Sequence, residues 1–116
     1  MNTAEAVRAK TENLKKRIDV LELEGNVSDL SIDGYTVIRD AAPLSFFEEL
    51  RESVLQVNHR MKGFRRFPTN LLNEGIVFEQ AVQLEKLNTL YEFLLGPNFI
   101  VSQVSASVKR TTPKPF

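Results

Sequence analysis

Hydrophobic residues recur at helical spacing over residues 43–61. Along this stretch the apolar positions follow one another at alternating intervals of three and four, which places them on one face of a helix. These positions are Phe47, Leu50, Val54, Val57 and Met61. Pro43 suits the first turn of a helix, and Gly63 can end it in a left-handed conformation. The pattern predicts an amphipathic helix over residues 43–61 whose apolar face lies in the core.

A second helical pattern covers residues 76–95. Its apolar positions are Phe78, Ala81, Val82, Leu87, Leu90, Tyr91, Leu94 and Leu95. Gly96 and Pro97 follow, and this pair ends a helix because glycine accepts the left-handed cap and proline cannot continue the helix. We expect either one helix here or two shorter helices separated near residues 83–85.

The N-terminal stretch, residues 3–24, has a thinner apolar stripe. Val7, Leu14, Ile18 and Leu21 recur at helical intervals among charged residues, and the pair after Glu24 is Gly-Asn, which favours a helix end. Two interpretations stand: a coiled-coil or partner-binding helix, or an N-terminal helix that lies loosely on the rest. The stripe is too short for a coiled coil, which favours the second. We therefore divide the chain into residues 1–26, an amphipathic helix, and residues 27–116, the main domain.

Two stretches have strand-like patterns. Residues 35–39 place Tyr, Thr, Val and Ile in succession after an Asp-Gly turn, and these side chains favour strands. Residues 99–110 alternate between two faces. The apolar face holds Ile100, Val104, Ala106 and Val108, and the polar face holds Gln103, Ser105, Ser107 and Lys109. The sequence therefore predicts an α+β fold, with a polar strand face that lines a site or faces solvent.

Charge and composition limit the partners and the compartment. Fifteen basic and fifteen acidic residues cancel, so no overall field attracts nucleic acid or an anionic membrane. The chain has no cysteine, no signal-peptide pattern, and no apolar run near the ~18 residues of a membrane span. We expect a cytoplasmic protein that binds neither nucleic acid nor membrane.

One segment departs from this neutral average. Residues 60–68 interleave four basic residues with two phenylalanines, a combination that could bind single-stranded nucleic acid or a CoA-linked substrate. A solvated loop whose Phe rings tuck under the fold explains the same residues, and four charges give only a small electrostatic contribution. The loop interpretation is favoured.

Residues for a self-sufficient catalytic site are not found in the sequence. His59 is the only histidine, and metal ligation needs partners that no H-x-x-H or H-x-D pair supplies here. Glu48, Glu49 and Glu52 have the spacing of a solvated helix face. The nucleophile-elbow and phosphate-loop motifs do not occur either. We expect no catalysis by this chain alone.

The order of several segments resembles the N-terminal region of the phytanoyl-CoA dioxygenase family. The likeness runs from about Asp33 to Phe116. It is carried by G-Y-T-V-I-R-D at residues 34–40, the proline that opens the next helix, Leu71-Leu72, G-I-V-F at 75–78, L-L-G-P-N-F at 94–99 and S-x-x-S-A-S at 102–107. The resemblance implies an Fe(II)- and 2-oxoglutarate-dependent hydroxylase of a small-molecule substrate. It also implies a double-stranded β-helix, or jelly roll, to which this chain would supply N-terminal helices and the first strands.

The iron site of that family lies outside this sequence. An H-x-D pair and a distal histidine hold the metal there, and the pair usually follows the strand that here ends at Arg110. The chain thus resembles the N-terminal portion of such an enzyme, truncated before the iron site and inactive as given. Through the resemblance, Lys109, Ser107 and Ser105 are the residues expected to approach 2-oxoglutarate. The alternative is a small, non-catalytic binding module.

Overall fold

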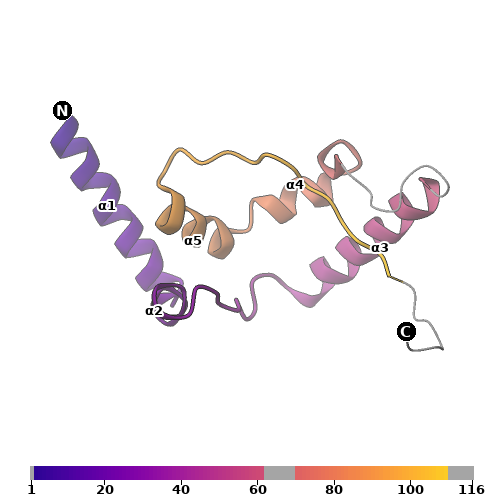
Figure 1. Ribbon diagram of the computed structural model, residues 1–116, viewed down its shortest axis with the longest axis horizontal. Helices are drawn as coiled ribbons and strands as arrows, with labels where there is room; N and C mark the ends of the chain where they lie inside the picture. The colour runs from indigo at the N-terminus through magenta and orange to yellow at the C-terminus, as the bar shows by residue number, and fades with distance from the viewer. Residues whose placement is uncertain (1, 62–69, 110–116) are drawn as a thin grey trace. The chain divides into compact units, whose positions relative to one another are not determined.

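The computed structural model describes residues 2–61 and 70–109, and the regular elements of this part are helices (Figure 1). They are α1 (Thr3–Val20), α2 (Glu24–Ile32), α3 (Leu44–Arg60), the 3-10 helix η1 (Leu71–Asn73), α4 (Ile76–Val82) and α5 (Glu85–Leu95). The chain divides into two compact units. Unit 1 comprises Met1–Ala42 with Val82–Ile100, and unit 2 comprises Pro43–Ala81 with Val101–Phe116.

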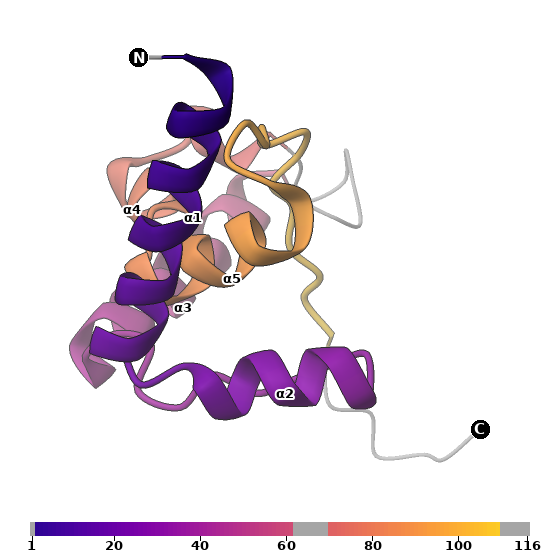
Figure 2. The same ribbon diagram turned by 90° about the vertical axis from the view of Figure 1, so that its left-hand side faces the viewer.

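Unit 1 is built on α5, against which both α1 and α2 pack. A capping box opens α1: Glu5 N–H donates to Asn2 Oδ1 over 2.8 Å, and Asn2 N–H donates to the Glu5 carboxylate. Figure 2 shows α2 running in a different direction from α1. The change occurs at Glu22, whose φ of 56° is left-handed and stops the first helix. Leu23, Thr89 and Leu90 are the fully buried residues of this unit among those described.

An ion pair fastens α1 to α5. The Arg17 guanidinium donates to the Glu92 carboxylate, and both side chains are partly buried. Arg17 also donates to Asn13 Oδ1 one turn earlier on the same helix. The C-terminal half of α1 is therefore held to unit 1 by a polar contact as well as by its thin apolar stripe.

Unit 2 encloses an apolar core made by α3, η1 and α4. Its buried members are Val57, Leu71, Val77 and Phe78. The half-buried side chains packed on them are Phe46, Leu50, Val54, Met61, Val104 and Ala106. The last two come from the extended segment of residues 101–109, which is joined to η1 where Leu71 N–H donates to Val104 O over 3.2 Å.

The expected α+β fold with the first strands of a jelly roll is wrong. Residues 35–38 and 101–109 are extended, but neither pairs with a strand among the described residues. In residues 35–38, side chains of α2 take the place of a neighbouring strand by bonding Thr36 and Val37. In residues 101–109, the apolar face packs on helices instead of on a second sheet. Strand-like patterning predicted an extended backbone here without predicting its partner.

The predicted helices agree more closely with the structure than the predicted strands do. The helix over residues 43–61 is confirmed as α3, although Phe46 packs on the core while Phe47 is 37% exposed. The break near residues 83–85 is confirmed by the gap between α4 and α5. The helix expected over residues 3–24 ends earlier, at Val20, and the Gly25-Asn26 pair that was expected to stop it lies inside a second helix, α2. The loop at residues 62–68 lies outside the described residues.

No described helix combines the length and the apolar character that crossing a membrane requires.

The core of unit 2 gives a direct stability prediction. Phe78→Ala removes a buried ring that is 2% exposed, which costs about 3–5 kcal/mol. We expect amide hydrogen exchange in α3 and α4 to accelerate at least about a hundredfold. Ile76→Ala is the control, because this neighbour on α4 is 69% exposed and its truncation should leave exchange nearly unchanged. Equal effects of the two substitutions would contradict this core.

Candidate functional site

A polar pocket of about 370 Å³ lies in unit 1. The turn after α1, the first turns of α2, the segment at residues 37–40 and one side chain of α5 form its walls. The lining residues are Leu21, Glu22, Leu23, Gly25, Asn26, Asp29, Val37, Ile38, Arg39, Asp40 and Lys86.

Side chains of α2 hold one wall of this pocket. Asn26 Nδ2 donates to Thr36 Oγ1 over 2.9 Å and to Val37 O over 3.0 Å. Thr36 Oγ1 in turn donates to the Asp29 carboxylate over 2.9 Å. The two α2 residues are three positions apart, so they share a helix face that looks toward the extended segment. This network fixes residues 36–37 along α2.

Lys86 holds the other end of the same segment. Its ammonium donates to Arg39 O at 3.5 Å and to Asp40 O at 3.3 Å. Asp40 has a left-handed φ of 53°, an uncommon conformation for a residue with a side chain. The ammonium thus stabilises a turn that the backbone alone would disfavour.

Three lining side chains hold the neighbouring segment in place, and we call Asn26, Asp29 and Lys86 the clamp. The Asn26 amide, the Lys86 ammonium and the Asp29 carboxylate all form hydrogen bonds with residues 36–40, so these groups are already occupied in holding that segment. The lining residues include no histidine, no cysteine and no hydroxyl-bearing side chain that could act as a nucleophile. We assign these residues a structural role.

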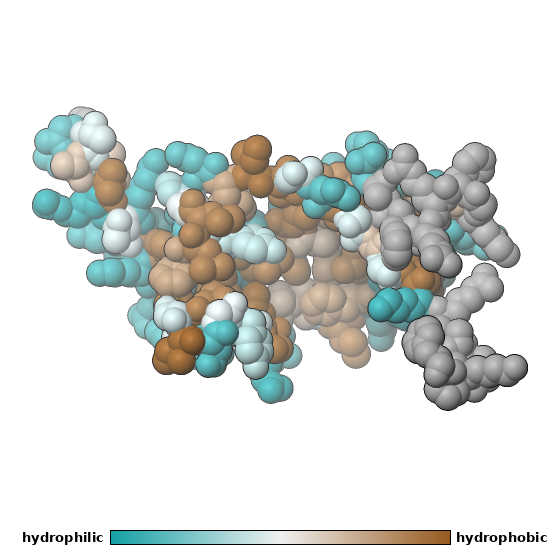
Figure 3. Space-filling model, in the orientation of Figure 1, coloured by the Kyte–Doolittle hydropathy of each residue, from teal (hydrophilic) through white to brown (hydrophobic). Residues whose placement is uncertain are grey.

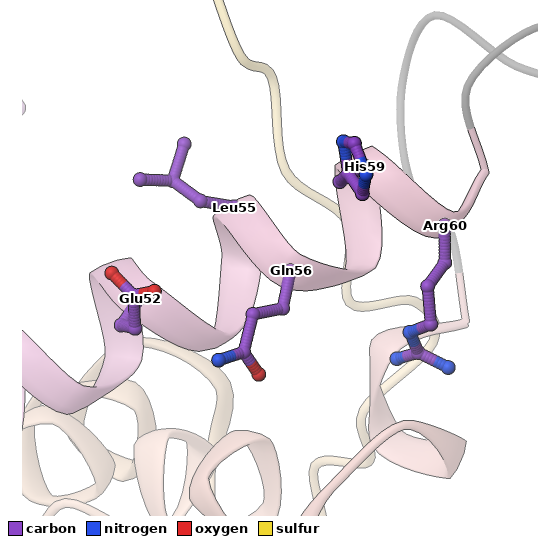
Figure 4. Close-up of a pocket in the computed structure, with 5 residues that line it drawn as sticks. All are labelled: Glu52, Leu55, Gln56, His59 and Arg60. Carbon is purple, nitrogen blue, oxygen red and sulfur yellow. The ribbon is translucent and has the colours of Figure 1, made fainter.

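A second hollow, of about 470 Å³, lies along α3. Glu52, Leu55, Gln56, His59 and Arg60 line it, and all come from this one helix. Figure 4 shows Leu55 and His59 pointing to one side and Gln56 and Arg60 to the other, so the polar groups do not converge. Arg60 is also paired with Glu74, at 3.1 Å. His59 is exposed.

The residues predicted to approach 2-oxoglutarate share one side of the extended segment in unit 2. Ser105, Ser107 and Lys109 are exposed, while the residues that alternate with them, Val104, Ala106 and Val108, are half-buried. The structure therefore brings the three polar residues to one face, as the alternation predicted. Ile100 was predicted on the apolar face and is instead 87% exposed.

Sequence reasoning missed the clamp residues Asn26, Asp29 and Lys86. The Gly-Asn pair at 25–26 indicated a turn, and this signal drew attention away from the bonding role of Asn26 on a helix face. Lys86 lies 46 residues from Asp40, and no local pattern connects two such positions.

Metal-ligand geometry is absent from residues 2–61 and 70–109, where no three His, Cys, Asp or Glu side chains are grouped to hold an ion. The facial triad implied by the resemblance needs two histidines, and the sequence contains only His59. The described residues therefore do not fit an iron site.

Comparison with known proteins returned no matching family model. No curated protein matched, and no solved structure matched.

The clamp can be tested by proteolysis. Asn26→Ala removes two hydrogen bonds, which should lower the free energy of opening residues 36–40 by about 1–2 kcal/mol. Arg39 is exposed, so trypsin should cleave after it roughly tenfold faster in the variant. Ser28→Ala, at an exposed position of the same helix, is the control that keeps the clamp. Unchanged cleavage in both variants would show that Asn26 does not restrain the segment.

Proposed function

We propose that this chain is a non-catalytic, helical part of an Fe(II)- and 2-oxoglutarate-dependent dioxygenase of the phytanoyl-CoA dioxygenase type. In this proposal it supplies packing surface and a polar segment beside the oxo acid, while other polypeptide of the enzyme supplies the iron ligands. The small-molecule substrate binds to the assembled enzyme.

The observation that carries the proposal is the exposed apolar face of α5. Tyr91, Leu94 and Leu95 are 41%, 53% and 67% exposed, and their spacing puts them on one helix face. Figure 3 shows apolar side chains in brown at the surface, next to polar ones. Contiguous exposed apolar residues usually mark a surface that another part of a protein covers.

The position of this face in the sequence supports the same proposal. Leu94 and Leu95 belong to the L-L-G-P-N-F stretch that carries part of the resemblance. Ile100, directly after this stretch, is 87% exposed. The stretch that resembles part of a larger enzyme therefore includes apolar side chains that are exposed among the described residues.

The polar residues of the extended segment have a defined role in this proposal. Lys109 carries an ammonium that can pair with a carboxylate of 2-oxoglutarate, and the hydroxyls of Ser105 and Ser107 can donate to carboxylate oxygens. All three are exposed on one side of the segment. Binding and orienting the oxo acid is the chemistry that they supply; the iron supplies oxygen activation when the complete enzyme binds it.

A binding module of independent stability is the second candidate. The core of unit 2 favours it, because Val57, Leu71, Val77 and Phe78 are almost fully buried without any partner. Thermal unfolding of the isolated chain separates the two candidates. A cooperative transition with little dye binding supports the module, whereas a broad transition with strong binding of an apolar dye supports the enzyme part.

The proposal predicts what flanks the coding segment in its source genome. Continuous coding sequence after the codon for Phe116 should encode an H-x-D pair within a few tens of codons and a histidine further on. These residues complete the facial triad that the present chain lacks. Continuous coding sequence without such a triad, or an immediate stop codon, would remove the enzyme assignment.

A turnover assay is the companion measurement. The isolated chain with Fe(II), ascorbate and 2-oxoglutarate should release no more succinate than the metal alone, because it contains one histidine. An active 2-oxoglutarate oxygenase in the same buffer serves as the positive control. Succinate formation by the purified chain would contradict the non-catalytic part of the proposal.

A further inference from the structure

The extended segment Val101–Lys109 has few of the features that prevent strands from associating. Natural sheet edges are protected by charges, prolines and bulges. Residues 101–108 contain no charged residue, no proline and no glycine, and Lys109 carries the segment's one charge, at its end. Serine and valine make up six of these eight residues. Such a neutral, β-favouring stretch is competent to pair with another extended backbone.

The backbone of this segment has two edges, and the structure distinguishes them. In an extended chain the N–H and C=O groups of successive residues point to opposite edges. Val104 O accepts from Leu71 N–H, so the even-numbered residues face η1. Gln103, Ser105 and Ser107 therefore direct their backbone groups to the opposite edge. None of their backbone groups bonds a backbone group elsewhere in the described chain.

We infer that this odd-numbered edge pairs with the same edge of a second copy of the chain. The two segments lie antiparallel about a two-fold axis at Ser105, so that the identical surface of each copy contacts the other. The inference rests on the backbone geometry of unit 2 and is independent of the oxygenase proposal.

Side-chain complementarity supports this register. With the axis at Ser105, Gln103 of one copy stands opposite Ser107 of the other, and both are polar and exposed. Val104 stands opposite Ala106, and this non-hydrogen-bonded pair brings two half-buried apolar side chains close together. The two apolar faces therefore continue into each other.

The charges are compatible with the same register. Lys109 of one copy stands opposite Val101 of the other, so the pairing opposes no like charges among the described residues. Residues 103, 105 and 107 of both copies would exchange about six backbone hydrogen bonds. The core already holds Val104 and Ala106 in place, which reduces the ordering entropy that strand pairing must overcome.

Sedimentation equilibrium of matched proline variants tests the inference. Ser105→Pro removes an N–H from the pairing edge, and Ser102→Pro removes one from the edge that faces η1. Both serines are exposed and both follow a valine, so the substitutions are matched in local sequence. We expect the wild type and Ser102→Pro to dimerise in a concentration-dependent manner. Ser105→Pro should weaken the dimer about thirtyfold, because two hydrogen bonds of ordinary strength disappear.

Amide exchange of the unmodified chain provides a readout that needs no variant. At dimer-forming concentration, the amides of residues 103, 105 and 107 should be protected relative to those of 102, 106 and 108. On dilution to the monomer this alternation should vanish. A monomer at millimolar concentration, equal weakening by both proline variants, or odd-residue protection that persists in the monomer would each overturn the inference.

Discussion

Burial of Phe78 against Val57 is the contact on which the geometry of unit 2 depends. Both side chains are 2% exposed, and they come from α4 and α3. Leu71 and Val77 complete the buried cluster, and half-buried side chains of α3 and of the extended segment close it. Because Val104 and Ala106 are among these half-buried side chains, the core also determines which face of residues 101–109 is turned inward. The exposed position of Ser105, Ser107 and Lys109 is a consequence of apolar packing.

Unit 1, unlike unit 2, is held together mainly by polar contacts. Its fully buried residues among those described are few, and polar contacts link its elements: Arg17 with Glu92, Asn26 with Val37, and Lys86 with Asp40. Each such contact contributes only about 1 kcal/mol. At the same time the apolar face at Tyr91, Leu94 and Leu95 is open to solvent. A thin core and an uncovered apolar face are together the physical basis for proposing that this surface belongs to a larger assembly.

Local sequence patterns predicted the helical character of residues 3–20, 44–60 and 76–95 because it depends on residues close in the chain, but they did not predict α2, since Gly25 and Asn26 indicated a helix end. The helix at residues 43–61 needed only helical periodicity, whereas for residues 76–95 the pattern left one helix or two open, and the structure has two. The strand predictions were wrong because a strand is defined by the strand that it pairs with, and the periodicity of one segment does not identify that partner. Alternation still predicted the exposed side of Ser105 to Lys109 correctly. The clamp formed by Asn26, Asp29 and Lys86 was not predicted, because it joins side chains of two helices to a segment outside both helices.

Nuclear magnetic resonance of a dilute, labelled sample can show whether residues 35–38 and 101–109 are extended without belonging to a sheet. Helical chemical shifts are expected for α1 to α5, together with contacts from the Ala106 methyl group to the Val57–Phe78 cluster. Residues 103–109 should show extended shifts without cross-strand contacts in the monomer. Cross-strand Hα–Hα contacts at either segment in that dilute sample would contradict a helical fold without a sheet in these residues.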